Sequence, residues 1–221
     1  MSYKLGILGG MGPEATCDLY KRIIKHTKSN CDQDHINAVI LNKCDIPDRT
    51  KYLMDDIESP VDALNEGIEE LIKLGCDYFI IPCNTAHVFV DQFKNLDKIK
   101  FINMIDCVKE EIKNKYNNKK ICVLCTKGTK LSKLYDGNLR YYPNNQEKIM
   151  NVVNNTKAGI DDTFNLQSVV DEESKNYDVF LLACTEISTY KDRIKTDRII
   201  IDAVDILVKN AILACGKEYI E

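Results

Sequence analysis

The sequence lacks the features that are typical of nucleic-acid-binding, membrane-spanning and secreted proteins. The 30 lysine and arginine residues and 34 aspartate and glutamate residues give a net charge of −4, and no basic block is present, which argues against nucleic acid and anionic membranes as partners. No apolar run approaches the roughly 18–20 residues that a bilayer span requires. Residues 1–12 also lack the long apolar region of a signal peptide. We therefore predict a cytosolic (cytoplasmic) protein that binds neither nucleic acid nor membrane.

Metal-binding and disulfide patterns are also missing, although cysteine is frequent. The chain has 10 cysteines among 221 residues, a share of about 4.5% that is below the roughly 8–10% of a disulfide scaffold. Only Cys122 and Cys125 form a C-x-x-C pair, and the 3 histidines show no spacing typical of a metal site. We predict no metal, and we expect most of the cysteines to be reduced and buried.

Apolar residues make up 44% of the chain, which is enough for a substantial core. They form short runs at residues 5–8, 38–41, 78–81, 101–105, 121–124, 179–182 and 199–201. Between several of these runs, apolar residues recur every three or four positions, as in Ala15, Leu19 and Ile23 and in the segment 61–72. Continuous apolar strands separated by helices are typical of parallel sheets covered on both faces, so we predict an α/β fold.

A weak internal repeat indicates two similar halves. Residues 77–83 (DYFIIPC) match residues 178–184 (DVFLLAC) in an aspartate, a phenylalanine and a final cysteine. Any two buried parallel strands share an apolar pattern, but the matched cysteines favour two related α/β subdomains. We predict that residues 1–105 plus 203–221 form the first subdomain and residues 106–202 the second.

Polar or glycine-rich turns follow four of the predicted strands, at residues 9–16, 82–87, 126–129 and 184–186. Ligands of α/β proteins bind at the carboxyl ends of the strands, and helix starts attract anions, so a small carboxylate is a natural ligand. Cys83 and Cys184 occupy equivalent turns and would enter one cleft from opposite sides, each at a helix start that stabilises a thiolate. One thiol can then remove a proton from a carbon while the other delivers a proton to the opposite face, which inverts that centre. Two inert buried cysteines are the alternative.

Three further features admit more than one interpretation. The segment 6–12 (GILGGMG) does not fit the dinucleotide pattern G-x-G-x-x-G, and we interpret it as a loop close to a small ligand or as a plain tight turn. Arg49 follows a predicted strand and either grips a carboxylate through two parallel hydrogen bonds or lies solvated on the surface. Lys157, two residues before Gly159, is equally ambiguous.

Four segments resemble the aspartate/glutamate racemase family, whose members invert acidic amino acids without pyridoxal phosphate. They are GGMGPEAT at 9–16, PDRT at 47–50, PCNTAH at 82–87 and ACTEI at 183–187. The resemblance extends from residue 4 to about residue 202, and it departs from the family at Ala183, where glycine is usual. It implies two similar α/β halves around a pseudo-twofold cleft, frequently assembled as a homodimer, and no cofactor.

The resemblance also implies a role for each site residue. Cys83 and Cys184 would be the acid/base pair that interconverts the L- and D-forms of aspartate, glutamate or both. Arg49 would bind the side-chain carboxylate, and Lys157 would assist it. The whole substrate-binding set implied is Met11, Arg49, Asn84, Thr85, Thr126, Lys157 and Thr185.

Three other functions compete with acidic amino-acid racemisation. A hydantoin racemase, maleate isomerase or decarboxylase has a similar scaffold and cysteines, although PDRT and PCNTAH favour acidic amino acids. An amino-acid-binding protein without turnover is the second, and the presence of both cysteines argues against it. A thiol redox or metal protein, the third, is suggested only by the cysteine count.

Overall fold

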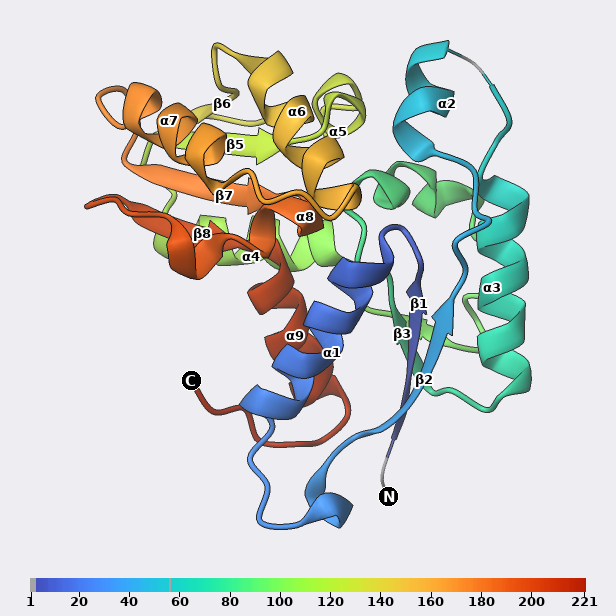
Figure 1. The fold of residues 1–221 in the computed structure, drawn as a ribbon. Coiled ribbons are helices and arrows are strands. Elements are labelled where there is room, and N and C mark those ends of the chain that lie inside the picture. The colour runs from blue at the N-terminus through green and yellow to red at the C-terminus, as the bar shows by residue number, and fades with distance from the viewer. Residues whose placement is uncertain (1–2, 56) are drawn as a thin grey trace.

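Two parallel four-stranded sheets form the framework of the protein, as the computed structural model of residues 3–55 and 57–221 shows (Figure 1). The first sheet has the order β2-β1-β3-β4 and consists of β1 (Lys4–Gly9), β2 (Asn37–Asn42), β3 (Tyr78–Ile80) and β4 (Lys100–Phe101). The second has the order β6-β5-β7-β8 and consists of β5 (Ile121–Cys125), β6 (Arg140–Tyr141), β7 (Val179–Ala183) and β8 (Ile199–Asp202). Every pair within these sheets is parallel, which confirms the predicted α/β class.

The internal repeat of the sequence corresponds to a repeat of backbone contacts. The Asp77 carboxylate accepts a hydrogen bond from the backbone N–H of Lys4 at 2.7 Å, and the Asp178 carboxylate accepts one from Lys120 at 2.9 Å. Each aspartate thereby fixes the start of one central strand, β1 or β5, against the neighbouring strand, β3 or β7, which leads into a turn with a cysteine. We call the elements around the first sheet the first half and those around the second sheet the second half.

Helices lie between the strands. They are α1 (Pro13–His26), η1 (Asp32–Asp34), α2 (Arg49–Asp55), α3 (Val61–Lys73), η2 (Asn84–Gln92), α4 (Met104–Lys115), α5 (Lys127–Leu131), α6 (Gln146–Lys157), α7 (Thr163–Glu173), α8 (Thr185–Ser188), η3 (Lys191–Arg193) and α9 (Ala203–Ala214), where η marks a 3-10 helix. α1 starts with Pro13, whose fixed φ suits the first helical position, and it buries Ala15, Leu19 and Ile23, as their spacing predicts. The local signals for this helix therefore agree with its packing.

The strand predicted at residues 101–105 is wrong beyond its first residue. Pairing ends at Phe101, and the side chain of Asn103 accepts hydrogen bonds from the N–H groups of Ile105 at 2.9 Å and Asp106 at 3.4 Å. This is an N-cap, so α4 starts at Met104 and buries Met104 and Ile105, the last two residues of the run, in a helix. A short apolar run does not distinguish the two structures. The two-residue strand β6 was not predicted at all.

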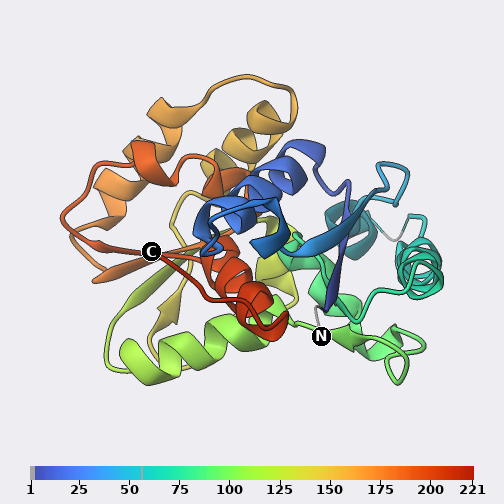
Figure 2. The same cartoon turned by 90° about the horizontal axis from the view of Figure 1, so that it is seen from below.

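One apolar core joins the two sheets. α9 packs against both α1 and α4, and the two views show these helices side by side between the sheets (Figures 1 and 2). Leu207 of α9 belongs to the same buried cluster as Leu19 of α1, Val108 of α4, Leu5 of β1 and Val123 of β5. Because this core is continuous, the predicted boundary at residue 203, which gives α9 to the first half, stays a prediction.

The described residues hold neither a membrane span nor a preformed metal cluster. No helix within 3–55 and 57–221 has both the length and the apolar character that a bilayer crossing requires. In the same ranges, no three His, Cys, Asp or Glu side chains are grouped so that they could bind a metal ion.

Candidate active site

The four polar turns predicted from the sequence lie at the carboxyl ends of β1, β3, β5 and β7, two strands from each sheet. They lead into α1, η2, α5 and α8, and residues from all four turns line one cavity of about 20 Å³. Its lining comprises Met11, Asp48, Arg49, Thr50, Cys83, Asn84, Thr85, Thr126, Lys157, Ala183, Cys184, Thr185 and Glu186. The structure thus brings every predicted site residue to a single cavity, while their roles stay predictions.

The glycine-rich loop after β1 is folded tightly against the next strand. Gly10 has a φ of +92°, and a Cβ at this position would lie 2.3 Å from the backbone carbonyl carbon of Lys43, so glycine is required. The Thr16 hydroxyl accepts the N–H of Gly10 at 3.0 Å and donates to the carbonyl of Gly12 at 2.9 Å. These contacts place Met11, which is buried, in the cavity wall.

Cys83 and Cys184 lie in matching positions of the two halves. Each has an extended backbone and directly precedes a helix, η2 or α8, and both side chains are buried. The Cys184 thiol donates a hydrogen bond to Oε2 of Glu186 at 3.0 Å. Burial, followed by the charge of Glu186 and this hydrogen bond, raises the pKa of Cys184 well above its ordinary value. The surroundings of Cys184 therefore favour the neutral thiol over the thiolate.

Hydroxyl and amide groups from both halves meet at the cavity. The Thr85 hydroxyl lies 3.0 Å from that of Thr126 and 2.9 Å from that of Thr129, which links the first half to the second. Oδ1 of Asn84 accepts a hydrogen bond from the Tyr135 hydroxyl at 2.5 Å. Nδ2 of Asn84 is buried and has no partner among the described residues. The amide N–H groups of Asn84 are therefore available to a bound molecule.

Arg49 is buried and uses part of its guanidinium group to hold backbone. Nη1 donates to the carbonyls of Ile46 at 3.1 Å and Pro47 at 3.0 Å, and Nη2 donates to that of Met11 at 3.3 Å. These contacts engage three of the roughly five N–H donors of an arginine. Nε is buried without a partner in the part of the chain that the structure describes. Arg49 is therefore not a solvated surface group, and it retains donors for a carboxylate.

Lys157 and Asp48 place opposite charges at the cavity. Lys157 is the last residue of α6 and is exposed. Oδ1 of Asp48 accepts the N–H groups of Thr50 at 2.8 Å and Lys51 at 2.9 Å at the start of α2. Burial acts to raise the pKa of Asp48, but these hydrogen bonds and the charges of Lys157 and Arg49 lower it overall. Asp48 is therefore ionised at neutral pH.

Glu186 is a candidate functional residue that the sequence reasoning missed. It is 6% exposed, its Oε2 also accepts from the Thr185 hydroxyl at 3.3 Å, and its Oε1 is buried without a partner among the described residues. The signals in the sequence were its place two residues after Cys184 and its inclusion in the segment ACTEI, but a carboxylate in a first helical turn is ordinarily explained by the helix dipole. Its burial arises from the loop packed over it: a Cβ on Gly12 would lie 3.2 Å from Oε1.

His87 supports the Cys83 turn from outside the cavity. Its Nδ1 lies 2.9 Å from the carbonyl of Cys83, and its Nε2 accepts the backbone N–H of Met104 at 3.2 Å. Because Nε2 is an acceptor, the proton is on Nδ1. Burial lowers the pKa of His87 to about 4, so the ring is neutral and ties the turn to the start of α4.

A larger, open cavity adjoins the small one. It has a volume of about 400 Å³ and shares Met11, Arg49, Lys157 and Glu186 with the small cavity. The small cavity has room for about one water molecule. The larger one lies in the range of roughly 300–1,000 Å³ typical of small-molecule sites. Access to the buried thiols from this side therefore requires the shared residues to move.

The fold and the cavity define a class of protein: a pair of α/β halves that contribute one thiol each to a shared polar site. The chain belongs to the Asp/Glu/Hydantoin racemase family, whose sequence profile matches residues 8–211.

Individual relatives agree with this assignment. The aspartate racemase of Picrophilus torridus is 31% identical and superposes with a TM-score of 0.88, covering 99% of this chain and 96% of that one. The broad specificity amino-acid racemase RacX of Bacillus subtilis is 28% identical over 224 residues, covering 94% of this chain and 96% of the relative. A glutamate racemase of Campylobacter jejuni, at 20% identity and a TM-score of 0.64, covers 99% of this chain and 88% of its own and shares the fold. These relatives are named as racemases, which are isomerases.

Proposed function

We propose that this chain is a cofactor-independent racemase that inverts an acidic amino acid at Cα, with Cys83 and Cys184 as the two acid/base groups. The observation that carries the proposal is that one thiol from each half lines the same cavity, each in the turn that follows the equivalent strand. The family and the named activities of the relatives support the same reaction type.

In the proposed reaction, a thiolate on one side of the substrate takes the proton from Cα. The electron pair of the broken C–H bond passes into the α-carboxylate, which becomes enolate-like. The thiol on the other side then gives its proton to the opposite face of Cα, and the S–H electron pair stays on sulfur. With the other enantiomer the two cysteines exchange roles. One thiol and one thiolate are therefore needed at a time, and the raised pKa of Cys184 favours it as the thiol in the direction in which Cys83 takes the proton.

The enolate-like intermediate requires hydrogen-bond donors that are already in place. Nδ2 of Asn84 is buried without a partner among the described residues, and the hydroxyls of Thr85, Thr126 and Thr185 lie in the same cavity. We assign these groups to the α-carboxylate and the amino group. In a water-free site, each such donor is worth more than in water. No electron-sink cofactor has a role in this mechanism.

The side-chain carboxylate of the substrate is assigned to Arg49. Its unused Nε–H and second Nη2–H are directional donors, and the charge of Lys157 adds to the attraction. Because the cavity has a volume of only about 20 Å³, the substrate must enter an opened form, and closure around it then removes water. We propose that the two predicted subdomains move apart for this step, and the homodimer implied by the family resemblance stays a prediction.

Aspartate and glutamate are both proposed substrates, since solved relatives are named as aspartate and as glutamate racemases. The two differ by one methylene, which an apolar pocket discriminates by only about 1–3 kcal/mol. The Bacillus subtilis relative is named for broad specificity, so neutral amino acids belong in the same assay panel.

The test is Cα exchange in D₂O with the L- and D-forms of both acids, read by chiral chromatography and mass spectrometry. We expect deuterium at Cα together with inversion, and loss of inversion in Cys83→Ala and in Cys184→Ala. Cys31→Ala, at an exposed cysteine, is the matched control and should be unaffected. Full activity in both site variants would refute the two-thiol mechanism, and binding without exchange would indicate a protein without turnover.

A further inference from the structure

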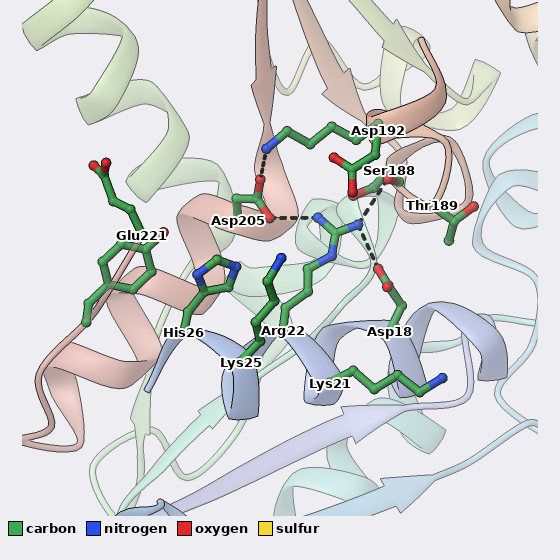
Figure 3. A pocket seen from close by; sticks show the side chains of 12 residues that line it. Asp18, Lys21, Arg22, Lys25, His26, Ser188, Thr189, Asp192, Asp205 and Glu221 are labelled. Atoms are coloured by element: carbon green, nitrogen blue, oxygen red, sulfur yellow. Dashed lines mark hydrogen bonds and ion pairs between the residues drawn. The ribbon is translucent and has the colours of Figure 1, made fainter. Parts of the chain in front are cut away.

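A single arginine of α1 connects elements of both halves on the side of the molecule shown in Figure 3. Nη1 of Arg22 lies 2.7 Å from Oδ2 of Asp202, at the end of β8, and 2.7 Å from Oδ1 of Asp205, in α9. Nη2 donates to the backbone carbonyl of Ser188, the last residue of α8, at 3.0 Å, and pairs with Asp18 at 2.7 Å. This network forms part of the wall of a cavity of about 430 Å³.

One end of the network leads directly to a proposed catalytic cysteine. The N–H of Ser188 donates to the carbonyl of Cys184 at 3.0 Å, closing the one short turn of α8. The Ser188 hydroxyl donates to Oδ2 of Asp202 at 2.5 Å, the same oxygen that Arg22 contacts. A displacement of Ser188 would therefore shift the backbone of Cys184 through a single hydrogen-bonded turn.

The other end of the network leads to the loop that closes the cavity. α1 begins at Pro13, directly after Met11 and Gly12, and its first turn is bonded to the carbonyl of Gly12 through the N–H and hydroxyl of Thr16. Arg49 donates to the carbonyl of Met11. Arg22 thus lies on α1, which follows the Met11 loop in the wall of the small cavity. Its hydrogen bond to Ser188 holds α8, the helix that follows Cys184.

The charges around Arg22 make its ion pairs costly to remove. Three carboxylates meet here, and that of Asp202 is fully buried; the other two belong to Asp18 and Asp205. Two positive charges oppose them: Arg22, and Lys191, which pairs with Asp205. Although burial acts to lower the pKa of Arg22, the charges of Asp202, Asp18 and Asp205 raise it overall, so the guanidinium stays ionised. Removing one partner of such a group leaves a buried charge uncompensated.

We propose that Arg22 is a positioning residue for the racemase reaction: it holds α8 against α1 so that the Cys184 thiol is aligned with the face of Cα opposite to Cys83. This inference rests on the proposed function. It assigns no contact between Arg22 and the substrate. Its physical basis is that misplacing a reacting group by about 1 Å can cost roughly a hundredfold in rate.

Loss of alignment has a specific signature in a two-thiol reaction. If Cys184 is displaced, Cys83 still takes the α-proton from one enantiomer, and its thiol exchanges with solvent. The carbanion is then reprotonated from the same side, so deuterium enters the starting enantiomer without inversion. A purely structural loss lowers the folded fraction and reduces exchange and inversion by the same factor, which leaves their ratio unchanged.

The experiment compares wild type with Arg22→Lys, which keeps the charge but has one nitrogen in place of the planar two-armed group. Asp205→Asn is measured alongside, because it removes one of the carboxylates that Arg22 contacts and leaves the arginine in place. Lys21→Met is the matched control: Lys21 lies next in the chain, lines the same cavity and forms no ion pair among the described residues. Folding is checked by circular dichroism, and turnover is started separately from each pure enantiomer in D₂O.

For the enantiomer whose proton is taken by Cys83, we expect kcat to fall about tenfold or more in Arg22→Lys. The ratio of deuterium in the recovered starting enantiomer to deuterium in the product should rise several-fold, with a smaller rise in Asp205→Asn and none in Lys21→Met. A wild-type ratio in the folded variants at residues 22 and 205 overturns the positioning role. A wild-type protein that shows neither exchange nor inversion overturns the proposed function instead.

Discussion

Cys184 is buried beside one carboxylate, that of Glu186. Oε2 of Glu186 accepts hydrogen bonds from both the Cys184 thiol and the Thr185 hydroxyl, and the carboxylate is almost fully buried. A buried negative charge next to a thiol opposes formation of a second one. At the scale of the residue, Glu186 therefore adds to the effect of burial, the largest cause, in holding the proton on the Cys184 thiol.

We predict that Glu186→Gln moves the alkaline limb of the pH profile of kcat/KM to lower pH. The active form carries one thiol and one thiolate, so the alkaline limb reports loss of the last thiol proton from the coupled pair. Removing the carboxylate charge takes away a cause of the raised pKa of Cys184, so that proton is lost at lower pH. The measurement is the initial rate of racemisation against pH.

Both enantiomers should show the same shift, because the equilibrium constant of racemisation is one and kcat/KM must change equally in both directions. Glu14→Gln is the control, since Glu14 is an exposed carboxylate that lines only the neighbouring cavities. An alkaline limb that does not move in Glu186→Gln would show that this carboxylate does not control the thiol.

At the scale of the element, the loop between β1 and α1 depends on backbone that only glycine can adopt. Gly10 combines a positive φ with close packing on Lys43, whereas Gly159, after α6, has a φ of +74° and nothing within 4 Å of the position of a Cβ. A substitution at Gly159 therefore introduces conformational strain alone, whereas one at Gly10 introduces strain and steric overlap.

Gly159→Ala should lower the free energy of unfolding by about 1–2 kcal/mol, the cost of a left-handed conformation in a non-glycine residue. Gly10→Ala should cost that amount plus about 1–3 kcal/mol for the overlap, and it should also reduce activity because the loop carries Met11. Urea unfolding of both variants measures the difference. Equal costs would mean that the loop relaxes away from Lys43.

Helices and strands were predicted correctly where the local sequence pattern was compatible with only one of the two structures. The spacing of Ala15, Leu19 and Ile23 identified α1 correctly. The run 101–105 failed because its apolar residues suit either structure, and the outcome was set by Asn103, whose side chain caps α4. The edge pairing of β6 involves two residues of each strand, too few to leave a pattern.

At the scale of the whole molecule, four of the six buried cysteines lie outside the small cavity and serve as apolar core. Six of the 10 are buried, and burial is the first cause of the raised pKa of Cys107 and Cys215, each to about 11, and of Cys125, to about 12. The ordinary pKa of a cysteine thiol is 9.0. Each of these thiols thus stays protonated in the folded protein at a pH where it ionises in the unfolded chain.

We therefore predict a loss of stability above about pH 9. Below that pH both states hold the thiol protons, so the contribution is fully present. As the pH rises toward about 11–12, the unfolded state binds fewer protons than the folded one, and the free energy of unfolding falls. Each such thiol contributes a slope of about 1.4 kcal/mol per pH unit. Urea unfolding at a series of alkaline pH values measures it.

The matched variants are Cys125→Ala and Cys31→Ala, at a buried and an exposed cysteine respectively. The slope should become shallower by one thiol in Cys125→Ala and stay unchanged in Cys31→Ala. Slopes are compared rather than absolute stabilities, because the smaller alanine side chain also leaves a cavity in the core. An unchanged slope in Cys125→Ala would contradict the prediction.

The sequence by itself determined the α/β class, the repeat and the turns that hold the candidate residues, because apolar periodicity and turn chemistry are local properties of the chain. It also placed Cys83 and Cys184 at equivalent strand ends. Only the tertiary structure decided that these turns line one cavity, that Arg49 and Glu186 are buried, and that Arg22 connects α1 to α8. These facts depend on contacts between residues far apart in sequence, such as Gly12 with Glu186 and Arg22 with Ser188, which no local pattern encodes.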